Sequence, residues 1–175
     1  LLAEAGRAPK SGGMAQATAR GAEAAAAVGS VRSPETYIGF ARADRFVSPG
    51  GQARDSAKSY AAAPLQLNDW ALEGGWTVGP QSGRLNSSPG AIDYRFHARD
   101  LHLVLGSAKP VRFRVSIDGK APEADAGVDV KPDGTGIIQE QRLYQLVRQK
   151  GDVRDRTFRI EFLDPGVEAF AFTFG

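Results

Sequence analysis

The sequence contains no cysteine, and this absence excludes several kinds of chemistry. Without cysteine the chain cannot form a disulfide, bind zinc through thiolates or carry out dithiol exchange by itself. Histidine is also scarce, with 2 residues, and no serine stands in the G-x-S-x-G sequence of a nucleophile elbow. Hydrolytic catalysis therefore has little support in the sequence, and we predict no catalytic residue.

Long apolar runs and an excess of one charge are missing as well. No apolar run approaches the roughly 20 residues that a membrane-spanning helix needs. The chain has 22 Lys and Arg against 20 Asp and Glu, and these are scattered along it. We therefore expect no nucleic-acid partner, because such a partner requires a concentrated basic surface. The chain begins on Leu1 rather than Met, so we expect any targeting signal to lie upstream.

Residues 1–32 differ from the rest of the chain. Leu1–Ala5 fits the end of a helix that Gly6 terminates, and Pro9 introduces a linker. Met14–Val28 is rich in alanine, the best helix former, but offers few large side chains for packing. We expect a short helical tether here, followed by one globular domain over residues 33–175.

The globular part alternates apolar and polar side chains with a period of two, which indicates β-strands. Gly74 and Gly75 predict a bulge, and Gln81–Gly90 predicts a loop rich in Gly, Ser and Asn. We expect strands at Thr36–Arg42, Ser56–Ala62, Trp70–Val78, Ala91–His97, Asp100–Gly106, Val111–Ile117, Gly136–Gln141, Leu143–Arg148 (which also fits a helical turn), Thr157–Leu163 and Val167–Phe174. Such a pattern predicts an all-β fold, a two-sheet antiparallel β-sandwich of the jelly-roll or a related type.

Five side chains are candidates for binding carbohydrate. Trp70, Trp76 and Tyr94 have aromatic faces of the kind that stack on sugar rings. Arg42 and Asp44 can hydrogen-bond to hydroxyl groups or bind an acidic ligand. The alternative is that the aromatic residues form the core, which large aromatics usually do, and that Arg42 belongs to a surface ion-pair network.

Two other groups of residues suggest metal binding or acid-base chemistry. Asp125, Asp129 and Asp133 supply oxygen ligands suited to Ca²⁺, but their spacing is not that of an EF-hand, and Asp is also common in solvated turns. His97 and His102 flank a short turn, so we expect them to face each other across a hairpin. A hydrolase would need one of them beside an Asp or Ser in a pocket. No further cofactor is expected.

Several segments occur in the order found in a known family. They are SPETYIGFARADRF (residues 33–46), LNDWALEGGWTV (67–78), IDYRFHARDLHLVLG (92–106), VRFRVSIDG (111–119), RLYQLVRQ (142–149) and FAFTFG (170–175). Together they resemble the C-terminal domain of DipZ-type thiol-disulfide oxidoreductases, and LLAEAG at the start resembles the last helix of a preceding thioredoxin domain.

The resemblance implies a periplasmic or otherwise extracytoplasmic protein, anchored to the membrane only through upstream segments. It also implies a β-sandwich similar to a carbohydrate-binding module, placed after a thioredoxin-like domain that carries the redox cysteines. We therefore expect a non-catalytic accessory domain that binds a glycan or a glycosylated client. The alternative is a structural or protein-interaction domain that packs on the thioredoxin-like domain and binds no sugar.

Overall fold

The computed structural model describes residues 28–175, and the predicted tether, at residues 1–27, lies outside them. The predicted domain boundary between residues 32 and 33 stays a prediction. The described part contains ten strands and two 3-10 turns, Val28–Ser30 and Glu123–Asp125. The strands are β2 (Thr36–Tyr37), β3 (Ala57–Tyr60), β4 (Trp70–Val78), β5 (Gly83–Phe96), β6 (Asp100–Gly106), β7 (Val111–Ile117), β8 (Thr135–Ile138), β9 (Arg142–Arg148), β10 (Arg156–Phe162) and β11 (Glu168–Phe174). Among residues 28–175 no helix has the length and apolar composition that crossing a lipid bilayer requires.

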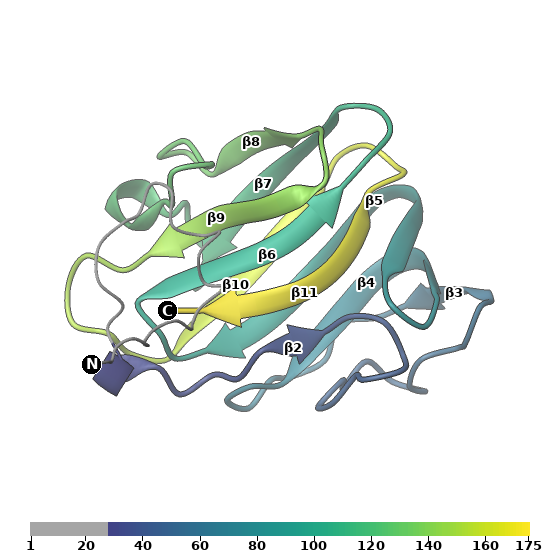
Figure 1. The fold of residues 1–175 in the computed structure, drawn as a ribbon, viewed down its shortest axis with the longest axis horizontal. Helices are drawn as coiled ribbons and strands as arrows, with labels where there is room; N and C mark the ends of the chain where they lie inside the picture. Colours follow the sequence, from purple (N-terminus) through teal and green to yellow (C-terminus); the bar gives the residue numbers. More distant parts are fainter. Residues whose placement is uncertain (1–27) are drawn as a thin grey trace, which may run out of the picture.

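The strands form one antiparallel sheet that curls into two packed layers. Figure 1 shows β9, β6, β11 and β2 in front of β7, β10, β5 and β4. The layers join where the start of β5 pairs with the start of β11, at Gly83↔Ala169 and Arg84↔Glu168. The expected all-β sandwich is therefore confirmed, with the two layers continuous at one corner.

The core lies between the layers because alternate side chains of each strand point inward. On β7, Val111, Phe113 and Val115 are buried while Arg112 and Arg114 are exposed. Aromatic rings connect the layers: the rings of Tyr94 and Phe172 lie 4.8 Å apart, and those of Phe158 and Phe172 lie 6.0 Å apart.

Two predictions of secondary structure were wrong. The segment Gln81–Gly90 was expected to be a loop, but β5 runs through it because its backbone pairs with β4 and β11. The expected strand Thr36–Arg42 stops at Tyr37, after which Phe40 and Ala41 donate hydrogen bonds to the turn that follows β4. The bulge expected at Gly74 and Gly75 is confirmed by register shifts on both sides of Gly75.

Candidate binding surfaces

The three aromatic candidates for sugar stacking lie in the core. Trp70, Trp76 and Tyr94 each have 0% of their surface exposed. The indole N–H of Trp76 donates to the carbonyl oxygen of Glu73 at 3.0 Å, and its ring meets Phe162 edge-on. A fully buried ring has no free face for a sugar, so in this structure these side chains pack the sandwich.

Arg42 and Asp44 line one polar pocket of about 230 Å³. The pocket is lined by Pro34, Glu35, Thr36, Tyr37, Arg42, Asp44, Arg45 and Asn68. The guanidinium of Arg42 lies 3.8 Å from the centre of the Tyr37 ring, and its Nη2 donates to the Tyr37 hydroxyl at 2.8 Å. Tyr37 in turn donates to Glu35, and this hydrogen bond is the main reason why the pKa of Tyr37 is raised.

Two of the buried aromatic residues form hydrogen bonds to residues that line the polar pocket. The indole N–H of Trp70 donates to the backbone carbonyl of Asp44 at 2.8 Å. The Tyr94 hydroxyl lies 2.6 Å from the hydroxyl of Thr36. The structure thus brings four of the five carbohydrate candidates to one region, with two in the wall of the pocket and two behind it. Trp76 lies elsewhere in the core.

The pocket also contains an aromatic residue that the sequence reasoning missed. Tyr37 is partly exposed, whereas the three aromatic residues singled out are buried. Its neighbours in the sequence gave a signal, because Glu35 and Arg42 flank it with opposite charges. A regular strand over Thr36–Arg42 does not reveal this signal, because it separates Tyr37 from Arg42, whereas the observed strand ends at Tyr37 and the chain turns.

The three aspartates considered for calcium have separate partners. Asp129 accepts hydrogen bonds from Arg142 and from the backbone N–H of Gln145. Asp133 accepts from the N–H and hydroxyl of Thr135, which lower its pKa. Within residues 28–175 no three His, Asp or Glu side chains gather closely enough to hold a metal ion.

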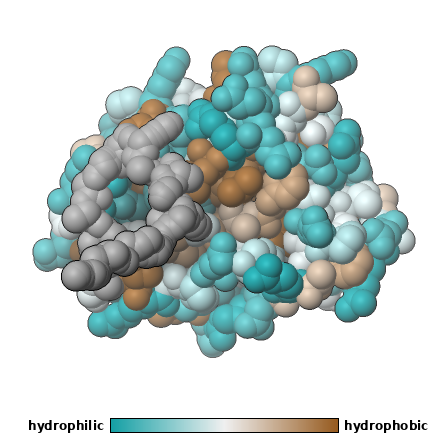
Figure 2. Space-filling model, viewed as in Figure 1, coloured by the Kyte–Doolittle hydropathy of each residue, from teal (hydrophilic) through white to brown (hydrophobic). Residues whose placement is uncertain are grey.

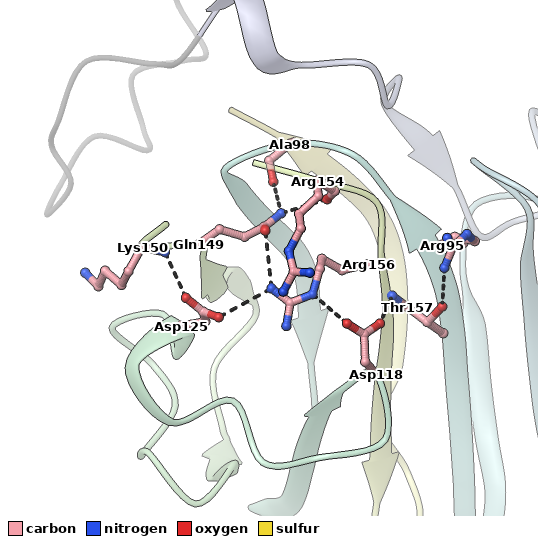
Figure 3. Close-up of polar contacts among 9 residues, drawn as sticks. All are labelled: Arg95, Ala98, Asp118, Asp125, Gln149, Lys150, Arg154, Arg156 and Thr157. Carbon is pink, nitrogen blue, oxygen red and sulfur yellow. Dashed lines mark hydrogen bonds and ion pairs between the residues drawn. The ribbon is translucent and has the colours of Figure 1, made fainter. Parts of the chain in front are cut away.

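Asp125 belongs to a network centred on Arg156 (Figure 3). Nε of Arg156 donates to Asp118 at 2.6 Å, and one of its terminal nitrogens contacts both Asp125 and Gln149. Gln149 donates in turn to the backbone carbonyls of Ala98 and Arg154. Only 13% of the Arg156 side chain is exposed, so the network ties β10 to the loop after β7 and to the end of β9.

The prediction that His97 and His102 face each other across a hairpin was wrong. Strand β5 pairs with β4, β10 and β11, whereas β6 pairs with β9 and β11, so the chain crosses between layers after His97. Nδ1 of His97 lies 2.6 Å from a carboxylate oxygen of Asp155. In residues 28–175 the structure shows no serine or threonine hydroxyl bonded to that ring; Ser33 bonds the backbone N–H of His97 instead.

The outer surface of the front layer carries a row of apolar side chains, which we call the sheet face. Leu143, Val104, Ala171 and Tyr37 are register partners across β9, β6, β11 and β2. Leu143, Val104 and Tyr37 are partly exposed. Figure 2 shows apolar residues gathered near the middle of this side of the molecule, within a polar surround. Patches of this kind on otherwise polar surfaces mark interaction sites.

His102 lies on the same face, two residues before Val104 on β6. It pairs with Gln145 on β9 and Thr173 on β11. Burial lowers its pKa, while the nearby carboxylates of Asp100 and Asp129 raise it. Burial dominates, so the ring is uncharged at neutral pH and adds no charge to the sheet face.

Comparison with known proteins matches this domain to one family and to longer relatives. Residues 33–175 match the family model described as the thioredoxin-like C-terminal domain. The chain is 26% identical over 143 residues to Protein DipZ of Mycobacterium bovis and, to the same extent, of Mycobacterium tuberculosis. Each match covers 82% of this chain but 18% of the relative, so the chain spans less than a fifth of these proteins.

Proposed function

Because the chain belongs to the family of thioredoxin-like C-terminal domains, we propose that it is a non-catalytic accessory domain of an extracytoplasmic thiol-disulfide oxidoreductase. Its similarity to Protein DipZ supports this setting. The absence of cysteine means that the redox thiols have to come from another part of the protein. The accessory domain then acts by contact rather than by chemistry.

The contact that we propose is packing of the sheet face on the thioredoxin-like domain of the same protein. The observation that carries this proposal is the apolar row on three neighbouring strands, in which Leu143 and Val104 are partly exposed and stand in register with the buried Ala171. Burial of Trp70 and Trp76 adds support, because it leaves the sandwich without the expected sugar platform. Interfaces between domains of one chain are typically of moderate size and mixed polarity, which suits a partly exposed apolar row with polar neighbours.

A titration of the chain with the thioredoxin-like domain of the same protein tests this contact. Isothermal calorimetry should show saturable binding, and Val104→Lys should weaken it at least tenfold by placing a charge in the apolar row. Arg114→Ala, a surface change on β7 in the back layer, should leave the affinity unchanged. Absence of binding, or equal affinity of wild type and Val104→Lys, would refute the proposal.

Carbohydrate binding is the second candidate, and the polar pocket favours it. Arg42 and Asp44 line the pocket beside the partly exposed Tyr37, so it offers charged and hydroxyl groups next to an aromatic ring. A panel of glycans and peptidoglycan fragments, followed by NMR shifts of the chain, tests it. Saturable shifts that Arg42→Ala abolishes and Val104→Lys preserves would support this function over the first.

A further inference from the structure

A second surface lies at the far edge of the back layer, where β8 ends the order of strands. A groove of about 700 Å³ opens there between β7, β8 and the loop of residues 128–131. We call it the β8 groove. It is lined by Arg112, Arg114, Val128, Asp129, Val130, Lys131, Thr135, Gly136, Ile137 and Leu163.

The β8 groove contains unusually exposed apolar side chains. Val128 is 71% exposed and Ile137 is 55% exposed, and they are the exposed large hydrophobic residues of the part that the structure describes. They come from different elements, the loop and β8, yet both line the groove. Two aliphatic side chains left in water at one place favour a ligand that covers them.

The loop that carries Val128 is held in place by hydrogen bonds. The N–H groups of Gly127 and Asp129 donate to the carbonyls of Leu146 and Gln145 on β9. Asp129 also accepts from the N–H of Gln145, and Val130 is buried. The wall of the groove is thus formed before any ligand arrives, which lowers the entropic cost of binding.

Two of the charged groups in the groove are already paired. Arg112 donates two hydrogen bonds to the carboxylate of Asp164, at 2.8 and 2.9 Å. Asp129 is bound by Arg142 at 2.9 Å. These ion pairs neutralise one positive and one negative lining residue and leave neither available for a ligand.

Arg114 and Lys131 are the remaining charged residues of the lining, and both are exposed. Neither has a salt bridge within residues 28–175. Glu161 stands opposite Arg114 in the register without an ion pair. Asp133, whose pKa both positive charges help to lower, accepts its hydrogen bonds from the N–H and hydroxyl of Thr135. Two positive charges therefore line the same groove as the two exposed aliphatic side chains.

We propose that the β8 groove binds an extended acidic polypeptide segment, with an apolar side chain against Val128 and Ile137 and carboxylates at Arg114 and Lys131. The period of an extended chain suits this arrangement, because acidic and apolar side chains that follow each other at every second position all point to the same side, toward the groove. A membrane surface fits less well, since recognition of anionic lipids usually relies on clusters of about four to eight basic residues. The site is distinct from the sheet face and goes beyond the function proposed above.

The test measures binding of a fluorescein-labelled peptide to the full 175-residue chain. In this peptide glutamate and leucine take turns at every second position, with serine at the positions between them, so that both point to the same side of the extended chain. Fluorescence anisotropy should show saturable binding that weakens as salt is added. A peptide with serine in place of leucine, and one with lysine in place of glutamate, should each bind at least tenfold more weakly. Equal binding of the three peptides, or no binding of the first, would overturn the proposal.

Variants of the chain locate the site. Two variants should each lower the affinity for the acidic peptide at least tenfold. One is the double change Val128→Ser with Ile137→Ser, and the other is the single change Lys131→Glu. These side chains are exposed, so the fold should persist, which circular dichroism checks. Arg84→Glu is the matched charge reversal at an exposed residue outside the groove and should leave the affinity unchanged.

Other occupants of the groove would give different results. The chain could bind vesicles of anionic lipid and not the peptide. If Lys131→Glu then abolished the vesicle binding, the proposal would be overturned in favour of a membrane. Self-association abolished by the Val128 and Ile137 changes, again without peptide binding, would overturn it in favour of a second copy of the chain. Val104→Lys should leave peptide binding intact, so failure of the groove and failure of the sheet face are distinguishable.

Discussion

Replacement of Trp76 separates a structural tryptophan from a sugar platform. The side chain is fully buried, its ring meets Phe162 with centroids 6.0 Å apart, and its N–H donates to Glu73. A tryptophan buries roughly 150–250 Å², which at roughly 25 cal/mol per Å² corresponds to about 4 to 6 kcal/mol as an upper value. We expect Trp76→Ala to lower the free energy of unfolding by about 3 to 5 kcal/mol.

Urea unfolding followed by far-ultraviolet circular dichroism measures this change. The midpoint should fall while the slope of the transition stays close to that of the wild type. Because Trp76→Ala can unfold a marginal domain, Trp76→Phe serves as a milder variant. It keeps an aromatic ring but leaves the carbonyl of Glu73 without its donor, and should cost about 1 to 3 kcal/mol.

One result would refute this reasoning. If Trp76→Ala kept the wild-type midpoint and abolished a saturable response to a glycan, the indole would have to be accessible to ligand. The core position of Trp76 would then not describe the protein in solution, and carbohydrate binding through the indole would become the leading function.

Three further predictions concern the Arg156 network, the pH dependence that Asp100 causes, and the loop that begins at Gly127. Arg156→Leu should lower the free energy of unfolding by about 2 kcal/mol, measured with urea, because it removes charge-assisted bonds to partly buried carboxylates; an unchanged midpoint would contradict this. Burial raises the pKa of Asp100, but hydrogen bonds from Arg148 and Arg99 lower it by more than burial raises it. The pKa of Asp100 is therefore below its usual value. The ionised Asp100 carboxylate therefore stabilises the fold above the unfolded pKa of about 3.9, and this stabilisation is lost as the pH falls below that value. Asp100→Asn should make the unfolding midpoint depend less on pH below about 4. An unchanged pH dependence would count against a stabilising role of the ion pairs of Asp100. Gly127→Ala should displace the loop before the β8 groove, because a Cβ there would overlap the carbonyl of Gln145, and amide exchange in the loop should accelerate.

The sequence predicted both bounds of β4, at Trp70–Val78, and it predicted both bounds again at two strands where alternation is strict. Asp100–Gly106 and Val111–Ile117 match β6 and β7 in both bounds, since each has aliphatic or aromatic residues at every second position. The first half of β5 escaped prediction because Leu85 is its single large apolar residue and polar residues surround it. That segment is a strand because its backbone pairs with β4 and β11, which are distant contacts that local composition does not reveal.

For the candidate binding residues, too, the sequence predicts some features and the tertiary structure decides others. The sequence identified Arg42 and Asp44, and folding placed both in one pocket. It also raised core packing as the alternative for Trp70 and Trp76, but residue type alone does not distinguish a buried indole from an exposed one. Burial depends on which face of the strand the opposite layer covers, and that is a property of the whole sandwich.

The sequence by itself determined the fold class, the family and the lack of thiol chemistry, because periodicity, segment order and composition are all local or additive properties. Only the tertiary structure decided which side chains meet. The curling of the sheet buried the aromatic residues, aligned Leu143 with Val104 and Ala171 on the front layer, and brought Val128 and Ile137 into the lining of one groove. Those juxtapositions depend on pairing between strands far apart in the chain, and local sequence patterns do not encode such pairing directly.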